Sequence, residues 1–195
     1  MDGFINAAIF LVQTLFTIYI VIFLIRILSP NLHGEHHNTI AQFIIKMTSP
    51  LILPLRRLIY RHRPVDFGAI IIVFLIGLLY TYFYVWLQTL YWLDLSYALL
   101  MTIATLLHLL VSILFWSILA DVLLSWITTN ERSLHEPRVV VAHLIQPIMS
   151  PLRRIVPLIY GLDFAPFIAI ILLKAVDIML ISQIAQLSLE QSFGG

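Results

Sequence analysis

The 195-residue sequence contains no cysteine. Without thiols the chain cannot form disulfides or thiolate-ligated metal sites, and it cannot attach haem covalently. Charged residues are also scarce, at 11% of the chain, whereas hydrophobic residues make up 61% and the mean hydropathy is +1.00. Soluble domains are roughly 45–50% apolar. Since a soluble fold could not bury this much apolar surface, the composition predicts a membrane protein.

Four apolar stretches are long enough to cross a bilayer, which takes about 20 residues in a helix. They cover about residues 4–28, 67–90, 97–120 and 164–187. The sequence therefore predicts an all-α membrane protein with four transmembrane helices.

Basic residues are missing from the short connection "YWLDLS" (91–96) between the second and third spans. Nine of the eleven Lys and Arg lie instead in the two long connections, between spans one and two and between spans three and four. Cytoplasmic loops carry an excess of Lys and Arg. We therefore expect both long loops to face the cytoplasm, and both termini and the short loop to face the opposite side.

The string Pro-Leu-Arg-Arg occurs twice, at positions that differ by 97 residues. Without a gap, Pro50, Pro54, Arg56, Arg57 and Asp66 align with Pro147, Pro151, Arg153, Arg154 and Asp163. The chain is thus predicted to contain two copies of one unit (span, basic loop, span), over residues 1–93 and 94–195. Because each unit has two spans, both copies share one orientation, related by an axis along the membrane normal.

Short amphipathic patterns precede both Pro-Leu-Arg-Arg segments. Apolar residues recur at helical spacing at Ile40, Phe43, Ile44 and Met47, and again at Val141, Leu144, Ile145 and Ile148. These patterns predict interfacial helices that lie in the cytoplasmic headgroup plane. We expect the prolines to break these helices and turn the chain, the arginines to contact lipid phosphates, and the aspartates to cap the next span. Alternatively, the four arginines bind an anionic lipid, a nucleotide or an acidic partner.

The duplicated S/Q-P-x-x-x-P-L-R-R pattern with a following Asp-Phe resembles the YggT family of integral membrane proteins, and the resemblance covers nearly the whole chain. It implies a non-enzymatic, multi-pass protein of the bacterial inner membrane, associated with osmotic-stress tolerance and ion balance or with the organisation of membrane assemblies. It implies no cofactor. The expected partners are anionic lipids and a homo-oligomer or another membrane protein, but not nucleic acid. The first unit departs from the pattern, because "YRHRPVDF" makes its loop more basic.

Two charged residues, Lys174 and Asp177, fall near the middle of the fourth span. A charge there costs about 2.5–3.5 kcal/mol on insertion scales. Their i, i+3 spacing puts both on one helix face. They form either a structural ion pair or part of the path of a small channel or transporter. Polar residues of the third span that faced them would favour the second interpretation, and the candidates are Thr102, Thr105, His108 and Ser112.

Other polar residues suggest weaker sites. Arg26 and Asp121 lie at the inner ends of spans one and three, where they form a cross-repeat salt bridge or extend separately to the headgroups. His108 is interpreted as a hydrogen-bonded structural histidine, since haem held between helices normally needs two. The "HGEHH" segment (33–37) is interpreted as a solvated loop rather than a metal site. A lipid-acting enzyme is the third hypothesis, but the sequence shows no catalytic motif, so we expect no enzyme activity and no bound metal.

Overall fold

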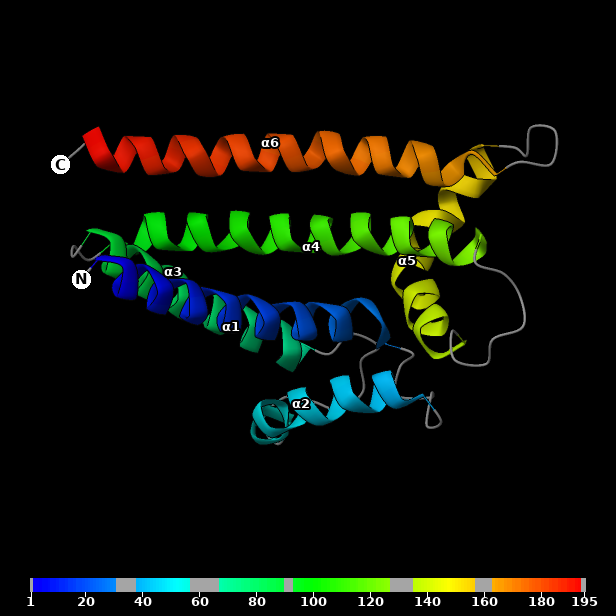
Figure 1. The fold of residues 1–195 in the computed structure, drawn as a ribbon, viewed down its shortest axis with the longest axis horizontal. Coiled ribbons are helices and arrows are strands. Elements are labelled where there is room, and N and C mark those ends of the chain that lie inside the picture. Colours follow the sequence, from blue (N-terminus) through cyan, green and yellow to red (C-terminus); the bar gives the residue numbers. More distant parts are fainter. Residues whose placement is uncertain are drawn as a thin grey trace.

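The computed structural model describes residues 2–30, 38–56, 67–89, 93–126, 135–156 and 163–193. These residues form helices and contain no strand. The helices are α1 (Asp2–Leu28), α2 (Thr39–Arg56), α3 (Phe67–Thr89), α4 (Leu95–Trp126), α5 (His135–Ile155) and α6 (Ala165–Phe193) (Figure 1). The predicted all-α class is confirmed.

Four of the helices are long and apolar enough to cross a membrane. Their apolar windows are Ile9–Leu28 in α1, Phe67–Leu87 in α3, Leu95–Ser125 in α4 and Ala165–Ser182 in α6. The four expected spans are therefore present. Helix α4 runs past the expected end of its span to Trp126. Its 32 residues rise about 48 Å, which exceeds a hydrocarbon core of about 30 Å, so α4 is tilted or projects beyond the bilayer.

The two termini lie at one end of the bundle, and α2 and α5 lie toward the other end (Figure 1). Helix α1 packs against α3, and α4 packs against α6. Helices α3 and α4 pack against each other and so join the two halves of the chain. Each half consists of a span, an amphipathic helix and a second span, which is the predicted unit. The unit boundary at residue 93 stays a prediction.

The prolines do not end α2 and α5, and the expectation that they would was wrong. Pro50 and Pro54 lie inside α2, while Pro147 and Pro151 lie inside α5. A proline lacks an amide proton and clashes with the carbonyl four residues earlier, which bends a helix that neighbouring contacts hold together. Both helices change direction along their length in Figure 1.

Helix α1 supplies donors to the part of α2 that precedes Pro50. The Tyr19 hydroxyl donates to the carbonyl of Met47 at 3.3 Å, and Arg26 Nη1 donates to the carbonyl of Ile45 at 3.4 Å. The Ser49 hydroxyl, within α2, also donates to the Ile45 carbonyl, at 2.5 Å. The two bonds from α1 attach α2 to its neighbour beside the bend, and such packing allows a helix to bend at a proline instead of ending there.

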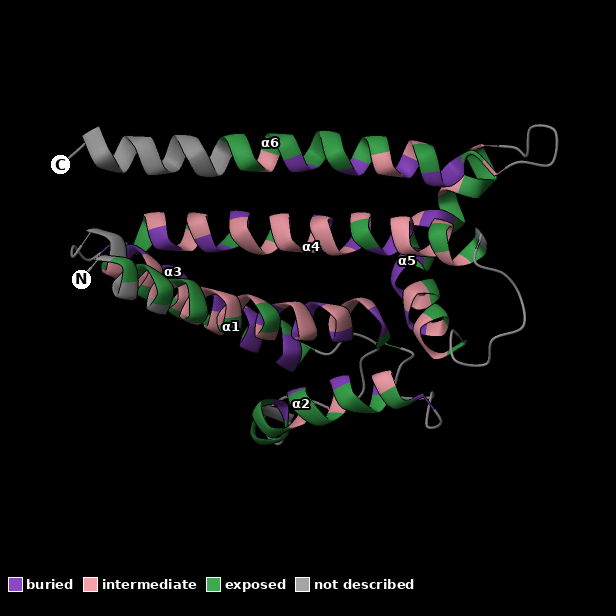
Figure 2. Cartoon of the chain, viewed as in Figure 1, coloured by how far each residue is buried: buried purple, intermediate pink, exposed green. Residues whose placement is uncertain are grey.

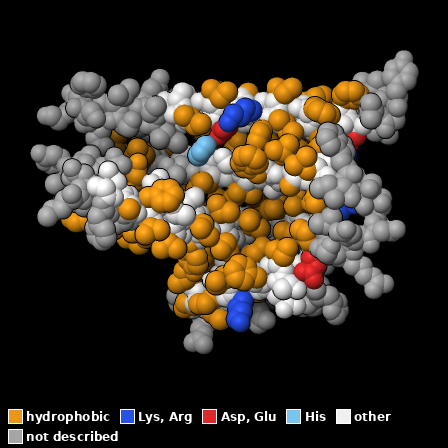
Figure 3. Space-filling model, in the orientation of Figure 1, with side chains coloured by type: hydrophobic (Ala, Val, Ile, Leu, Met, Phe, Trp, Pro, Cys, Tyr) orange, Lys and Arg blue, Asp and Glu red, His pale blue; other side chains and the backbone are white. Residues whose placement is uncertain are grey.

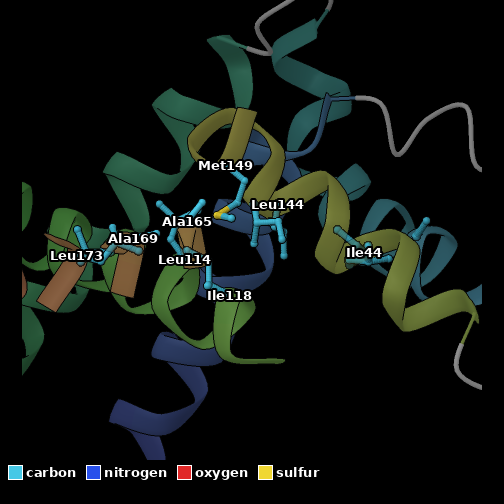
Figure 4. Packing of buried hydrophobic residues seen from close by; sticks show 12 residues of the cluster. Ile44, Leu114, Ile118, Leu144, Met149, Ala165, Ala169 and Leu173 are labelled. Carbon is cyan, nitrogen blue, oxygen red and sulfur yellow. The ribbon is translucent and has the colours of Figure 1, made fainter. Parts of the chain in front are cut away.

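One hydrophobic cluster connects α2, α4, α5 and α6. Figure 4 shows Ile44, Leu114, Ile118, Leu144, Met149, Ala165, Ala169 and Leu173. The small Ala165 and Ala169 let α6 approach its neighbours closely, which is how helices associate in lipid. A second cluster, which includes Phe23 of α1 and Ile72 of α3, fills the first half of the chain.

The predicted apolar face of α2 is divided in the structure. Ile44 is buried, but Phe43 and Met47 are 50% and 45% exposed. Helix α2 therefore packs on the spans through a row that also contains Ala41, Thr48 and Ile52 and leaves a second apolar edge open (Figure 2). Placement of this edge in the headgroup plane stays a prediction.

Candidate charged cluster within the spans

The carboxylate of Asp177 joins α4 to α6. Its Oδ1 lies 2.6 Å from Nδ1 of His108 in α4, and its Oδ2 accepts a hydrogen bond of 2.7 Å from Nζ of Lys174. Asp177 is 6% exposed. Each carboxylate oxygen thus has a polar partner. We refer to His108, Lys174 and Asp177 as the charged cluster.

The charged cluster lies near mid-depth of the two spans. Asp177 comes twelve residues after Ala165, the first residue of α6, which places it about 18 Å along the helix axis. A bilayer core is about 30 Å thick. Water cannot solvate charges at this depth, so the contacts within the charged cluster replace hydration.

The cluster is open on one side. The Lys174 side chain is 54% exposed, and its Nζ lies 5.8 Å from the centre of the Phe115 ring, in a cation–π contact. The His108 side chain is 31% exposed. Figure 3 shows basic, acidic and histidine side chains adjoining one another over α4 and α6 among hydrophobic side chains. In a single chain this face would place an ammonium group against lipid.

The four polar residues of the third span do not form one stripe toward α6. Among the contacts described for them, His108 reaches Asp177, whereas Thr102 Oγ1 lies 3.1 Å from Thr81 Oγ1 of α3. Six residues separate Thr102 from His108, and at 3.6 residues per turn this puts them about 120° apart around the axis. The hydrogen bond expected of His108 is therefore present, and its partner is Asp177. Of the candidate residues, His108 faces the pair and Thr102 does not.

The second Pro-Leu-Arg-Arg segment contacts the start of α6. Arg153 Nε lies 2.8 Å from Oδ2 of Asp163, and Asp163 Oδ1 accepts a hydrogen bond of 3.0 Å from the amide of Ala165. Arg154 is exposed. The side chains of Arg153 and Asp163 are 52% and 30% exposed, so the ion pair is worth about 0.2–1 kcal/mol. In the first repeat, Arg57 and Asp66 and the side chain of Arg56 lie outside the described residues.

Arg26 is buried in the structure, at 3% exposure. It donates to the Thr48 hydroxyl and to the Ile45 carbonyl of α2. Asp121 lies half-buried near the end of α4. The cross-repeat pairing of Arg26 with Asp121 stays a prediction.

A polar junction that the sequence analysis missed joins the two repeats at the start of α2 and α5. Asn38 Oδ1 caps α2 by accepting from the amide of Ala41 at 3.0 Å, and Asn38 Nδ2 donates to the Glu136 carbonyl at 2.9 Å. The Thr39 amide donates to Glu136 Oε2 at 3.0 Å. In the 97-residue alignment, Asn38 and Thr39 match His135 and Glu136. Equivalent parts of the two repeats therefore meet here.

The described residues contain no group of three His, Asp or Glu side chains arranged to hold a metal ion. The "HGEHH" segment lies outside the described residues.

Fold and site together define a multi-pass helical membrane protein built from a duplicated span–amphipathic helix–span unit. The CCB3/YggT family model matches residues 5–87 and 100–184, so the chain belongs to the CCB3/YggT family.

Relatives span nearly the whole chain. The "uncharacterized protein YggT" of Escherichia coli (strain K12) is 28% identical over 175 residues, which cover 88% of each chain. The "uncharacterized protein PA0392" of Pseudomonas aeruginosa is 28% identical over 198 residues, covering 96% of this chain and 95% of the relative. A Vibrio alginolyticus protein is 28% identical over 176 residues, covering 90% and 94%. No solved structure matches the chain.

Proposed function

We propose that the chain is a non-enzymatic inner-membrane protein that organises membrane components and supports osmotic-stress tolerance or ion homeostasis. Its working surface is the cytoplasmic end of the bundle, where the two Pro-Leu-Arg-Arg segments bind anionic lipid headgroups or an acidic partner. The observation that carries this proposal is the junction between Asn38 and Glu136, which couples the two helices that bear these segments.

The position of the arginines within α2 and α5 supports this role. Arg56 is the last residue of α2, and Arg153 and Arg154 lie in the last turn of α5. Cations are favoured at helix C-termini. Near an anionic leaflet each exposed Arg contributes about 1 kcal/mol of binding. Two coupled basic segments therefore bind more strongly than either one alone.

The proposal is tested by replacing Arg56, Arg57, Arg153 and Arg154 together with glutamine. We expect growth at high osmolarity to fall to the level of a deletion strain while the protein stays at its normal abundance in the membrane. Arg138→Gln is the matched control, because Arg138 is exposed on the first half of α5. Full growth of the fourfold variant would refute the role of the arginines.

The orientation can be tested in the same protein because the chain has no cysteine. A membrane-impermeant maleimide added to spheroplasts should label Ser96→Cys, which is exposed in the first turn of α4, and should not label Ala142→Cys in α5. Ala142→Cys should be labelled after lysis. The reverse pattern would place the arginines outside the cell and refute the proposed cytoplasmic role.

The charged cluster favours a second candidate function, a small channel or transporter. One polar residue of the third span, His108, faces Lys174 and Asp177, and a polar residue in this place favours an ion path between α4 and α6. Ion flux into proteoliposomes under an osmotic gradient should then be lost in the Lys174→Ala/Asp177→Ala variant. Thr81→Ala/Thr102→Ala is the control, since it removes polar groups of the spans outside the charged cluster. Absence of flux in the wild-type protein would reject this candidate.

A further inference from the structure

Helices α3 and α6 are the second spans of the two repeats, and on one face of each helix the residues at aligned positions are buried in both. In the 97-residue alignment, Gly68 matches Ala165 and Ile72 matches Ala169. All four are buried. They lie on the faces that pack within each repeat, where α3 contacts α1 and α2, and α6 contacts α4 and α5. The alignment of the Pro-Leu-Arg-Arg segments therefore extends into the spans.

A second face of α3 packs across the repeat boundary onto α4. It consists of Gly77, Thr81 and Val85, which are buried. A Cβ atom on Gly77 would lie 3.1 Å from Cγ2 of Thr102, and Thr81 Oγ1 lies 3.1 Å from Thr102 Oγ1. Val85 belongs to the cluster that contains Ala98. This face makes a close helix–helix contact of the kind that small residues permit in membranes.

The equivalent face of α6 has no such cover within the chain as described. It consists of Lys174, Ile178 and Ser182, all of which are exposed. Ile178 is 60% exposed, and the Lys174 side chain 54%. The contact that α3 makes with α4 of the other repeat thus has no counterpart on α6 among the described residues.

The repeat relation also identifies which surface would cover α6. Helix α1 is the counterpart of α4, and we align the two at a shift of 95, the difference between the first residues of the two segments that the family model matches. This shift differs from the 97 of the later helices because the connections that follow α1 and α4 differ in length. Leu106, Leu110 and Ile113 of α4 pack beside the α1–α3 cluster. With this shift their counterparts on α1 are Leu11, Leu15 and Ile18, which are 61%, 68% and 52% exposed.

We propose that α6 of one copy packs against α1 of a second copy of this chain, repeating between chains the contact that α3 makes with α4 within it. The side chains suit this pairing. Gly77 faces the larger Thr102, whereas Lys174 would face Ala7, the counterpart of Thr102, so that a large residue again meets a small one. The contact covers the open side of the charged cluster, and it does not depend on the proposed role of the arginines.

The interface is head-to-tail, because it joins two different surfaces of the same chain. Such interfaces generate closed rings when the rotation between neighbours closes. Since α3 and α4 are antiparallel neighbours in sequence and α1 and α4 share an orientation, α6 and α1 of the next copy are also antiparallel. All copies therefore have the same orientation in the membrane, as copies of one chain inserted in the same way must have.

Cysteine cross-linking tests the proposal directly in this cysteine-free chain. Ile178 and Ala7 are the counterparts of Thr81 and Thr102, whose side chains touch. Two differently tagged chains, Ala7→Cys and Ile178→Cys, should form a disulfide-linked pair when co-expressed and oxidised in membranes. Thr81→Cys/Thr102→Cys in one chain is the positive control for this geometry, because it should close an intrachain disulfide under the same conditions.

The matched negative control replaces Ile178→Cys with Leu172→Cys. Leu172 lies on α6 and is similarly exposed, at 55%. It precedes Ile178 by six residues, which puts the two about 120° apart around the helix axis. We expect at least ten times more linked pair with Ile178→Cys than with Leu172→Cys. Equal yields from both pairs would overturn the proposal. The absence of a linked pair, in an experiment in which the positive control closes, would also overturn it. This holds whether the protein in lipid particles has the mass of a monomer or that of an oligomer, because an oligomer would then be joined through other surfaces.

Discussion

Replacing Asp177 with asparagine isolates the contribution of the charged cluster to stability. The substitution keeps the side-chain shape but removes the negative charge that Lys174 and His108 share. An unpaired lysine at mid-depth costs about 2.5–3.5 kcal/mol on insertion scales. An interhelical hydrogen bond in a membrane contributes about 0.6 kcal/mol on average. Asparagine can still accept a hydrogen bond from one of the two neighbours, so the lost charge accounts for most of the effect. We therefore expect the free energy of unfolding to fall by about 3 kcal/mol.

The assay is reversible unfolding of the purified protein in mixed micelles, followed by far-ultraviolet circular dichroism as the denaturing detergent increases. Thr81→Val is the matched control, since it removes one buried hydroxyl that contacts Thr102, and it should cost only about 0.6 kcal/mol. Lys174→Met/Asp177→Leu removes both charges and should be less destabilising than Asp177→Asn. If Asp177→Asn cost no more than Thr81→Val, the ion pair would not stabilise the bundle and our reasoning would be wrong.

Three further substitutions test other contacts. Glu136→Ala removes the acceptor of the Thr39 amide, which should lower stability by about 1 kcal/mol and speed hydrogen exchange in the first turn of α2; unchanged exchange would argue against the junction. Gly77→Leu overfills the contact with α4 and should cost about 1–3 kcal/mol, measured as a lower melting temperature, and an unchanged temperature would contradict the close packing. Arg153→Gln should cost at most about 1 kcal/mol, because its pair with Asp163 is half-exposed; a larger loss in detergent unfolding would show that this ion pair is more than a surface contact.

Hydropathy was sufficient to predict the spans. Transfer of apolar side chains from water to lipid depends on composition and length, and both can be read along one dimension. The Pro-Leu-Arg-Arg repeat likewise predicted two units before any contact was known. The local rule for proline failed, however, because a helix that contacts a neighbour can bend at Pro50 instead of ending, and the contacting groups, Tyr19 and Arg26, come from another helix.

The sequence by itself determined the number of spans, the duplication and the presence of charges at mid-depth, because each follows from spacing along the chain. The tertiary structure decided which faces meet. It turned Thr102 toward α3 and His108 toward Asp177. It also placed Glu136 beside Asn38, although the two residues are 98 positions apart in the sequence. It also left Lys174 half-exposed where Gly77 is buried. Such contacts depend on the rotation and tilt of each packed helix, which a one-dimensional pattern does not specify.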